Sequence, residues 1–230
     1  MPTYATPGPL AVTVDLDVGD VQIVASDRAD TIVTVVPADP GNDDSRQAAR
    51  RVRLIQSPGI LEIRQSLPWY QQFGRGTKFG IVTITIELPT GSTVRGRTSL
   101  GTFVTDGRLG ESEFSSDLGD FRLGEITDSL RVNGVTGDVL VRRAHADVDV
   151  TTTTGDIRLA EVIRGTVVLS TSIGEIEVGV REGSAARLDV RTKLGRVRNT
   201  LNGVDNPADY ADTILVRART NLDDIVIRRV

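Results

Sequence analysis

Glycine recurs at nearly even intervals through the second half of the chain, and this repeat constrains the fold more than any other feature. Gaps of 18, 18, 18, 19 and 21 residues separate six of the glycines, and Asp223 stands where a seventh would fall. The six are Gly101, Gly119, Gly137, Gly155, Gly174 and Gly195. Self-similarity at a fixed period is the sequence signature of a repeat architecture.

Apolar and polar residues alternate on both sides of each of these seven positions. The positions seven and five residues before, and two and four residues after, hold 24 apolar residues out of 28, whereas the five interleaved positions hold 5 out of 35. This period of two indicates two short strands per repeat, each with one face inward, joined at the glycine. Because one repeat cannot bury its own apolar face, the pattern predicts an all-β fold, a parallel β-solenoid (β-helix-like) with rungs of about 18 residues.

The residues around the glycine predict how the corner between the two strands is built. A threonine or serine stands three residues before it in six of the seven copies, and stacked hydroxyls can hydrogen-bond along the ladder or to nearby backbone. The glycine predicts a positive φ, which Asp223 can also adopt. The acid that follows the glycine is expected to point outward; it is Asp120, Asp138, Asp156 or Glu175.

Charged positions also align between copies and are expected to hold the rungs in register. Arg95, Glu113, Arg131 and Asp149 occupy one column in consecutive copies, and Arg158, Glu177 and Arg198 occupy another. With neighbouring rungs about 4.8 Å apart, opposite charges in a column should pair across the ladder.

The rest of the chain predicts a cap and one continuous domain. Residues 1–90 read as an N-terminal β layer that covers the open end of the solenoid, with a copy of the repeat around Gly19 and a short helix at 43–53 that begins with Asp43 or Asp44 as N-cap. Residues 91–230 hold the solenoid repeats, with a loop inserted at 202–212 and Arg228 and Arg229 blunting the last edge.

Composition excludes several kinds of chemistry. The chain has no cysteine and one histidine, so thiolate zinc sites, redox thiols and histidine clusters are absent, and no cofactor is expected. A net charge of -4 lacks the basic field of a nucleic-acid binder. The start, "MPTYATPGPLAVTVDLDV", resembles no secretory signal, and no stretch reaches 18 apolar residues, which favours a cytoplasmic protein without membrane insertion.

The repeat lacks the sequence motifs of established calcium-binding and phosphate-binding loops. Asp20, Asp120, Asp138 and Asp156 each follow a glycine, and the period of 18 is twice that of calcium-binding β-rolls, but the G-G-x-G-x-D motif is missing. "GRGTKFG" and "GTFVTDGRLG" lack the spacing of a phosphate-binding loop. The Gly-Asp pair therefore reads as a structural corner, with weak cation binding as the alternative.

Two enzymatic readings stay open as minority alternatives. A Ser-His-Asp triad would have to use His145, whose place in "RRAHADV" suggests a corner side chain. A carbohydrate-active β-helix enzyme could use Asp138, Asp156, Arg158 and Glu175 on an outer face, and would need a cleft with two carboxylates about 5–10 Å apart.

The stretch "LPWYQQFGRGTKFG" at 67–80 departs most from the repeat. It places Trp69, Tyr70 and Phe73 beside Arg75 and Lys78, a combination suited to binding a protein or glycan partner. The alternative is that these rings cover the end of the solenoid.

Several segments together resemble a known family. The opening "TPGPLAVTVDLDVGDVQIVASDRADTIVTVVPAD", the junction "VTITIELPTGSTVRG" and the rung "TTTTGDIRLAEV" resemble the bacterial β-strand-repeat family called "putative adhesins", of the kind common in actinobacteria. The resemblance implies a β-helix-like fold of unknown function, without catalytic residues, and a location at the cell surface. Residues and resemblance together favour a non-enzymatic, adhesin-like interaction or scaffold module; the alternatives are a β-solenoid that self-associates through its end rungs and the carbohydrate-active enzyme.

Overall fold

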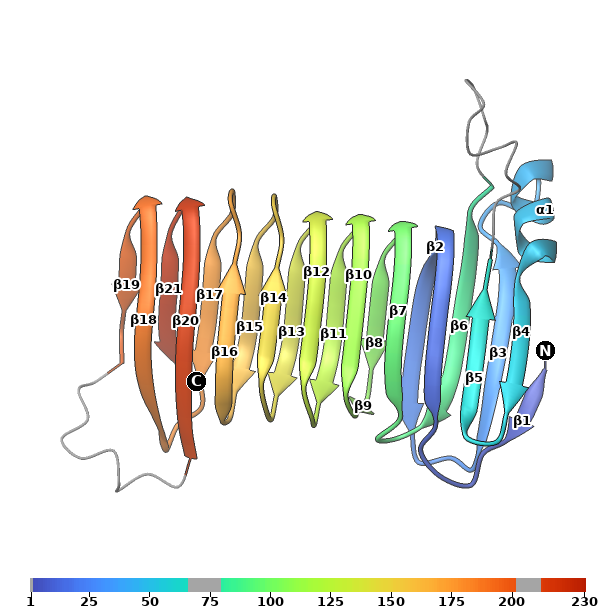
Figure 1. The fold of residues 1–230 in the computed structure, drawn as a ribbon, viewed down its shortest axis with the longest axis horizontal. Coiled ribbons are helices and arrows are strands. Elements are labelled where there is room, and N and C mark those ends of the chain that lie inside the picture. Colours follow the sequence, from blue (N-terminus) through green and yellow to red (C-terminus); the bar gives the residue numbers. More distant parts are fainter. Residues whose placement is uncertain (1, 66–79, 202–211) are drawn as a thin grey trace.

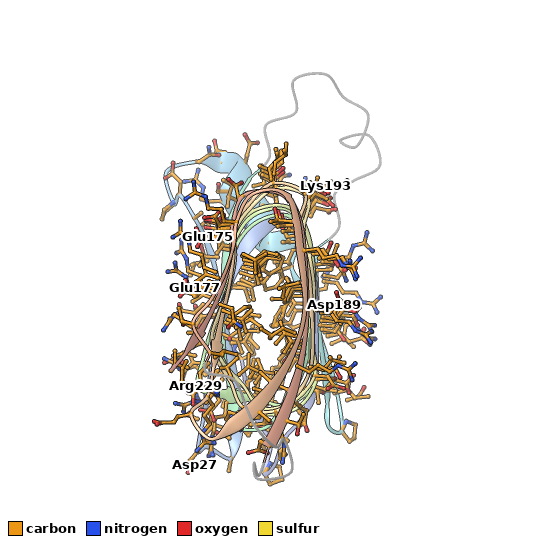
Figure 2. The ribbon with its side chains drawn as sticks, turned by 90° about the vertical axis from the view of Figure 1, so that its left-hand side faces the viewer. Asp27, Glu175, Glu177, Asp189, Lys193 and Arg229 are labelled. Carbon is orange, nitrogen blue, oxygen red and sulfur yellow. The ribbon has the colours of Figure 1, made fainter. Side chains whose placement is uncertain are left out.

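The chain folds as two β-sheets that face each other and are connected rung by rung. The computed structural model describes residues 2–65, 80–201 and 212–230. Figure 1 shows the rungs stacked along the long axis of the molecule, and Figure 2, which looks along that axis, shows side chains filling the space between the two sheets. This is the predicted parallel β-solenoid, with two sheets per rung.

The central rungs have the predicted 18-residue spacing. Phe114 pairs in register with Gly96 on one side and with Val132 on the other, an offset of 18 residues each time. Each rung contributes one strand to each sheet. In chain order the strands are β7 (Thr93–Leu100) with β8 (Phe103–Asp106) and β9 (Arg108–Leu109), β10 (Ser112–Leu118) with β11 (Phe121–Ile126), β12 (Leu130–Thr136) with β13 (Val139–Ala144), β14 (Val148–Thr151) with β15 (Ile157–Val162), and β16 (Gly165–Ser170) with β17 (Ile176–Val180).

Apolar side chains from the alternating positions fill the interior in complementary sizes. Phe103, Phe114 and Phe121 are at most 1% exposed, and the ring centroid of Phe103 lies 5.2 Å from that of Phe114 and 6.0 Å from that of Phe121. Gly96 occupies an inward position where a Cβ would lie 2.6 Å from the Phe103 ring. The one glycine among the inward columns therefore makes room for the largest side chains.

The corner glycines are required by the stacking of the rungs as well as by their backbone conformation. Gly155 has a φ of 141°, and a Cβ there would lie 2.0 Å from the carbonyl oxygen of Gly137 in the preceding rung. Asp223 takes the corner position of its rung with a φ of 89°, as the sequence predicted. Each glycine corner thus brings two backbones closer than a side chain allows.

The last two rungs are stacked in the reverse of their sequence order. β20 (Asp212–Leu222) pairs with β16, and β18 (Ser184–Leu194) pairs with the other side of β20. In the second sheet, β21 (Ile225–Arg229) likewise separates β17 from β19 (Val197–Asn199). The final segment of the chain is inserted as the second-to-last rung, which Figure 1 shows in red beside the orange β18.

This inserted rung changes the predicted charge pairs at that end. Arg95–Glu113 at 2.9 Å, Arg131–Asp149 at 4.0 Å and Arg158–Glu177 are confirmed. The prediction of an ion pair between Glu177 and Arg198 was wrong, because β21 lies between their strands. Glu177 pairs with Arg228 instead, and Arg198 pairs with Asp224 at 3.2 Å.

The expectation that Arg228 and Arg229 blunt the last edge was also wrong. Both lie on the interior strand β21. The Nη1 of Arg229 donates hydrogen bonds to the carbonyl oxygens of Arg181 and Ser184, so this arginine fastens the turn before β18.

The copy of the repeat around Gly19 forms an interior rung. A single long strand, β2 (Ala11–Ser26), bends between the two sheets and pairs on one side with β7 and β8. On its other side it pairs with β5 (Ile60–Arg64) and β6 (Val82–Pro89). Because β2 joins strands from both halves of the sequence, we propose that residues 1–90 and 91–230 form one continuous domain.

Antiparallel strands and a helix close the N-terminal end. β3 (Asp30–Pro37) pairs antiparallel with β6, β4 (Arg53–Ser57) pairs antiparallel with β5, and β1 (Thr3–Ala5) adds to β3. The predicted helix is α1 (Asp43–Arg51), but its N-cap is Asn42 and not Asp43 or Asp44. The Asn42 side-chain oxygen accepts hydrogen bonds from the backbone N–H of Asp44 and Ser45. Asp43 and Asp44 therefore lie in the first turn, where their negative charges interact favourably with the positive end of the helix dipole.

Candidate binding surface

The aromatic loop predicted to bind a partner lies outside the described residues. Trp69, Tyr70, Phe73, Arg75 and Lys78 all fall within 66–79, so their role stays a prediction. The candidate surface below is built from the described rungs.

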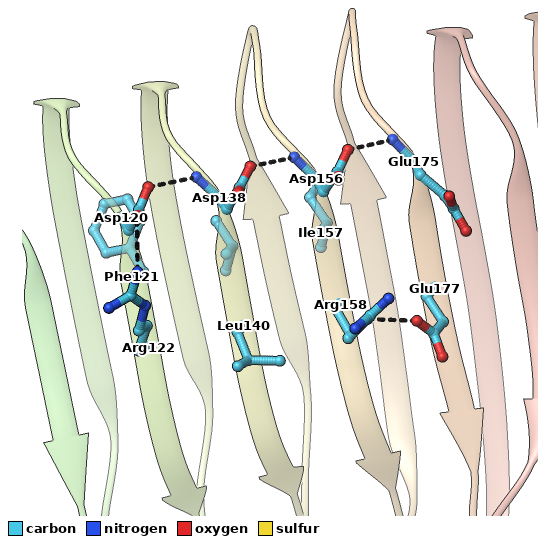
Figure 3. A pocket seen from close by; sticks show the side chains of 11 residues that line it. Asp120, Phe121, Arg122, Asp138, Leu140, Asp156, Ile157, Arg158, Glu175 and Glu177 are labelled. Atoms are coloured by element: carbon cyan, nitrogen blue, oxygen red, sulfur yellow. Dashed lines mark hydrogen bonds and ion pairs between the residues drawn. The ribbon is translucent and has the colours of Figure 1, made fainter.

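The acids that follow the corner glycines form a hydrogen-bonded row along the solenoid, which we call the aspartate ladder. The Oδ1 atom of Asp120 accepts the backbone N–H of Asp138 at 3.1 Å, Asp138 accepts that of Asp156 at 2.9 Å, and Asp156 accepts that of Glu175 at 2.8 Å (Figure 3). Asp20 makes the same bond to the Thr102 backbone at 2.9 Å. Each bond links one rung to the next, so the Gly-Asp pair holds the corners in register.

The ladder explains why aspartate, rather than a longer acid, follows the glycine. A carboxylate on a single methylene group reaches the backbone of the adjacent rung about 4.8 Å away. One oxygen of each carboxylate is used in this way, while the Asp120 Oδ2 also accepts from Arg122 Nη2 at 3.2 Å. Within the described residues, no group of three or more acidic, histidine or cysteine side chains is arranged to hold a metal ion.

A pair of variants of Asp138 separates the hydrogen bond from the charge. Asp138→Ala removes the acceptor for the Asp156 backbone N–H and is expected to lower the free energy of unfolding by about 1 kcal/mol. Asp138→Asn keeps an oxygen acceptor and removes one of several neighbouring negative charges, so its stability should lie within about 0.5 kcal/mol of the parent. Urea unfolding followed by circular dichroism measures both. Equal losses of unfolding free energy in the two variants would show that the negative charge, and not the hydrogen bond of the ladder, stabilises the fold at this position.

The acids considered for glycosidase chemistry lie on an exposed edge. Asp138, Asp156, Arg158 and Glu175 are all exposed. Figure 3 shows the three acids in a line over consecutive rungs, with Arg158 further along the strand beside Glu177. Asp138 and Asp156 each accept a backbone N–H from the following rung, and Arg158 pairs with Glu177. Together with Asp120, Arg122 and Glu177, these residues line a hollow of about 250 Å³ (Figure 3). A glycosidase needs two carboxylates that face the sugar from opposite sides of a cleft, whereas Asp138 and Asp156 stand in one row and each use one oxygen in the ladder.

His145 is half-buried in the bend that follows β13, next to charged side chains. Its Nε2 atom lies 2.7 Å from Glu125 Oε1, and its carbonyl oxygen accepts from Arg164 Nε at 3.1 Å. Arg143 pairs with Glu161 at 2.6 Å, and that hydrogen bond raises the pKa of the Arg143 guanidinium. In residues 2–65, 80–201 and 212–230, no serine or threonine hydroxyl bonds to His145, so the structure assembles no triad there.

The residues just before the corner glycines form a second row, which the alternation of apolar and polar residues did not predict. Leu118 pairs in register with Leu100, Ile173 with Leu222, and Leu222 with Leu194. Thr136 and Thr154 bridge the middle of the row. We call the exposed aliphatic members of this column the apolar row: Leu100 (42% exposed), Leu118 (50%), Ile173 (46%), Leu222 (37%) and Leu194 (71%).

The columns of the apolar row and the aspartate ladder run side by side, because a single corner residue separates them; in the rungs of Leu118 and Ile173 an acid follows that corner directly. We call the two together the corner edge. The signal was present in the sequence, since the column one residue before the glycine reads Leu, Leu, Thr, Thr, Ile, Leu and Leu. An exposed aliphatic row is unusual on a monomer surface and marks a candidate interaction site.

The comparison with protein families agrees with the fold. A family model described as "Toastrack DUF4097" matches residues 11–211. Similar solved structures are a "putative cell adhesion protein" from Clostridium sporogenes (14% identity, 100% of this chain and 98% of that chain, TM-score 0.44) and a "putative lipid binding protein" from Parabacteroides distasonis (13%, 100% and 95%, 0.46). A "putative adhesin" from Bacteroides fragilis is also similar (12%, 98% and 95%, 0.42).

These identities are too low to transfer a ligand or an activity to this chain. No curated protein matches the chain in sequence. Among the described residues, no helix has the length and apolar character needed to span a membrane.

Proposed function

We propose that this chain, which belongs to the Toastrack DUF4097 family, is a non-enzymatic, adhesin-like binding module that presents the corner edge to a partner. The observation that carries this proposal is the apolar row: five aliphatic side chains between 37% and 71% exposed, aligned along a rigid solenoid. Apolar surface that is held in a fixed line gains free energy when a partner covers it.

The chemistry of the corner edge favours a basic, amphipathic polypeptide as the partner. The apolar row can take a line of aliphatic or aromatic side chains, and the acids of the adjacent ladder can attract lysine or arginine beside them. Leu118 and Asp120, two residues apart, place both kinds of contact on one rung. A glycan is the second partner class; its hydroxyl groups would find few hydrogen-bonding partners along the aliphatic row.

The basic residues at the C-terminal end support a partner other than nucleic acid. Arg187 and Arg191 lie on β18, whereas Arg198 lies on β19 in the opposite sheet. Arg191 and Arg198 each pair with an aspartate, at 3.4 Å and 3.2 Å. A phosphate backbone would need these cations unpaired and on one face.

The test uses a synthetic peptide of alternating leucine and lysine, labelled for fluorescence anisotropy. The parent protein is expected to bind it, and Leu118→Ser is expected to raise the dissociation constant about fivefold or more, because burying the exposed half of one leucine contributes about 1 kcal/mol. Binding should weaken as the salt concentration rises, since the ladder carboxylates attract the lysines.

Ile55→Ser is the matched control. Ile55 is 50% exposed, as Leu118 is, but it lies on β4 in the N-terminal cap. If Ile55→Ser weakens binding as much as Leu118→Ser, the peptide binds apolar surface in general and the corner edge is not the site. Binding to a glycan array without binding to the peptide would also overturn the polypeptide proposal.

The compartment stays a prediction. The sequence favours the cytoplasm, and the family resemblance implies the cell surface. Labelling of intact cells with an impermeant amine reagent separates the two, because Lys193 is exposed on β18.

A further inference from the structure

One end of the solenoid is capped, whereas the strand at the other end has an edge that no described strand pairs with. The N-terminal end is closed by the antiparallel strands β3 and β4 and by α1. At the other end, β18 pairs with β20 on one side, and no described strand pairs with its outer edge. β18 is eleven residues long, so this edge presents a long row of backbone groups to solvent.

The interior of the terminal rung is only partly covered. Ala186, Leu188 and Val190 point inward from β18 and are half-buried. Their register partners one rung further in are Ile214, Val216 and Ala218, and each of these is 0% exposed. One more rung over β18 would bury the same three positions to the same degree.

We propose that the missing rung is supplied by a second copy of this chain, with the two β18 strands paired antiparallel about a two-fold axis at Leu188. In this register Leu188 faces Leu188 of the second copy, and Ala186 faces Val190. The inward-facing side chains of Ala186, Leu188 and Val190 in the two copies then form one continuous core. This interface goes beyond the proposed function and does not depend on binding at the corner edge.

Charge selects this register. A two-fold axis at Leu188 places Arg187 opposite Asp189 of the second copy, and the symmetry makes this pair twice. An axis at Val190 would place Arg187 opposite Lys193, two like charges. Arg187 has no ion pair within the described part of its own chain, while Asp189 pairs with Arg219 at 3.1 Å and Arg191 at 3.4 Å and keeps lone pairs for another donor.

The cap at the other end makes the assembly a closed dimer. Once the two β18 edges are joined, the free ends of both copies carry the antiparallel strands and α1, which leave no parallel rung to extend. An isologous contact that uses the same edge on both subunits closes after two copies. Filaments are therefore not expected.

Sedimentation velocity over a concentration series from about 1 to 500 µM tests the proposal. The parent protein should shift from monomer to dimer and stop there. In Arg187→Asp, the new aspartate of each copy faces Asp189 of the other copy. The repulsion in these two symmetric pairs should raise the dimer dissociation constant at least about tenfold. Its melting temperature at low concentration should match the parent, because Arg187 makes no ion pair within the described chain.

The double variant Arg187→Asp with Asp189→Arg is the decisive control. It restores opposite charges across the two-fold axis with the signs exchanged, so its dimer dissociation constant should return to within about threefold of the parent. Asp189→Arg alone should separate the dimer as Arg187→Asp does. Because it also removes the ion pairs of Asp189 with Arg191 and Arg219, the melting temperature of each Asp189 variant at low concentration is measured to establish that the monomer is folded. A parent protein that stays monomeric throughout, a dimer unaffected by Arg187→Asp, or growth beyond the dimer would each overturn the proposal.

Discussion

Replacing Gly155 with alanine is expected to destabilise the protein by about 3 kcal/mol or more. The backbone φ of 141° already disfavours a side chain, and the new Cβ would lie 2.0 Å from the carbonyl oxygen of Gly137. Relief of that clash requires the two rungs to move apart, which breaks the parallel ladder on both sheets. Urea unfolding followed by circular dichroism measures the loss.

Gly183→Ala separates the clash from the conformational cost. Gly183 has a φ of 83°, but no atom lies within 4 Å of the position of a Cβ. Its alanine variant should therefore lose only about 1 to 2 kcal/mol, the cost of a left-handed backbone for alanine. If the Gly155 and Gly183 variants lost equal stability, the close approach of the stacked corners would be contradicted.

Replacing Phe103 with alanine is expected to cost about 3 to 5 kcal/mol. Phe103 is 0% exposed, and its ring packs against Phe114 and Phe121 in the adjacent rung, so truncation opens a cavity in the centre of the stack. Gly96 offers no side chain that could move to fill it. The same unfolding measurement gives the result.

Phe103→Leu is the matched control for the cavity. Leucine keeps most of the apolar volume, so its loss should stay at about 1.5 kcal/mol or less. In a stack whose rungs touch only their neighbours, the cavity at Phe103 should also reduce cooperativity, which appears as a lower denaturant slope. Similar small losses for the leucine and alanine variants would show that the ring is not packed as the structure describes.

The repeat frame could be predicted from the sequence because its columns are set by local geometry. A glycine at the corner and apolar residues at two and four positions after it place Ile157 and Leu159 inward beyond Gly155, and both are 0% exposed. Period-two alternation leaves little freedom once one face is buried.

The order of the rungs could not be predicted in the same way. Every rung presents an apolar interior of similar shape, so β18 and β20 can each pair with β16, and sequence neighbours were expected to be neighbours in space. The deciding differences are small: β20 buries Ile214, Val216 and Ala218 completely. A periodic pattern predicts the conformation of each rung, but it does not predict the order in which the rungs stack.

The roles of the corner residues were predicted only in part. Asp120, Asp138 and Asp156 were expected to point outward. Asp138 and Asp156 are exposed and Asp120 is half-buried, but their hydrogen bonds to the next rung depend on a stacking distance that a single sequence does not display. The apolar row was not predicted, because the two strands that meet at the corner assign the position before the glycine to opposite faces. At a corner, a residue such as Leu118 can be aliphatic and still lie outside.

Chemical-shift mapping of the isotopically labelled protein with the leucine–lysine peptide tests the central claim most directly. We expect the largest changes at backbone amides of the corner edge, from Leu100 and Leu118 through Asp138 to Ile173, in several consecutive rungs. The outer face of β12, β14 and β16, away from that edge, should stay unchanged. Changes confined to that outer face, or no changes at peptide concentrations that saturate binding, would contradict the assignment of function to the corner edge.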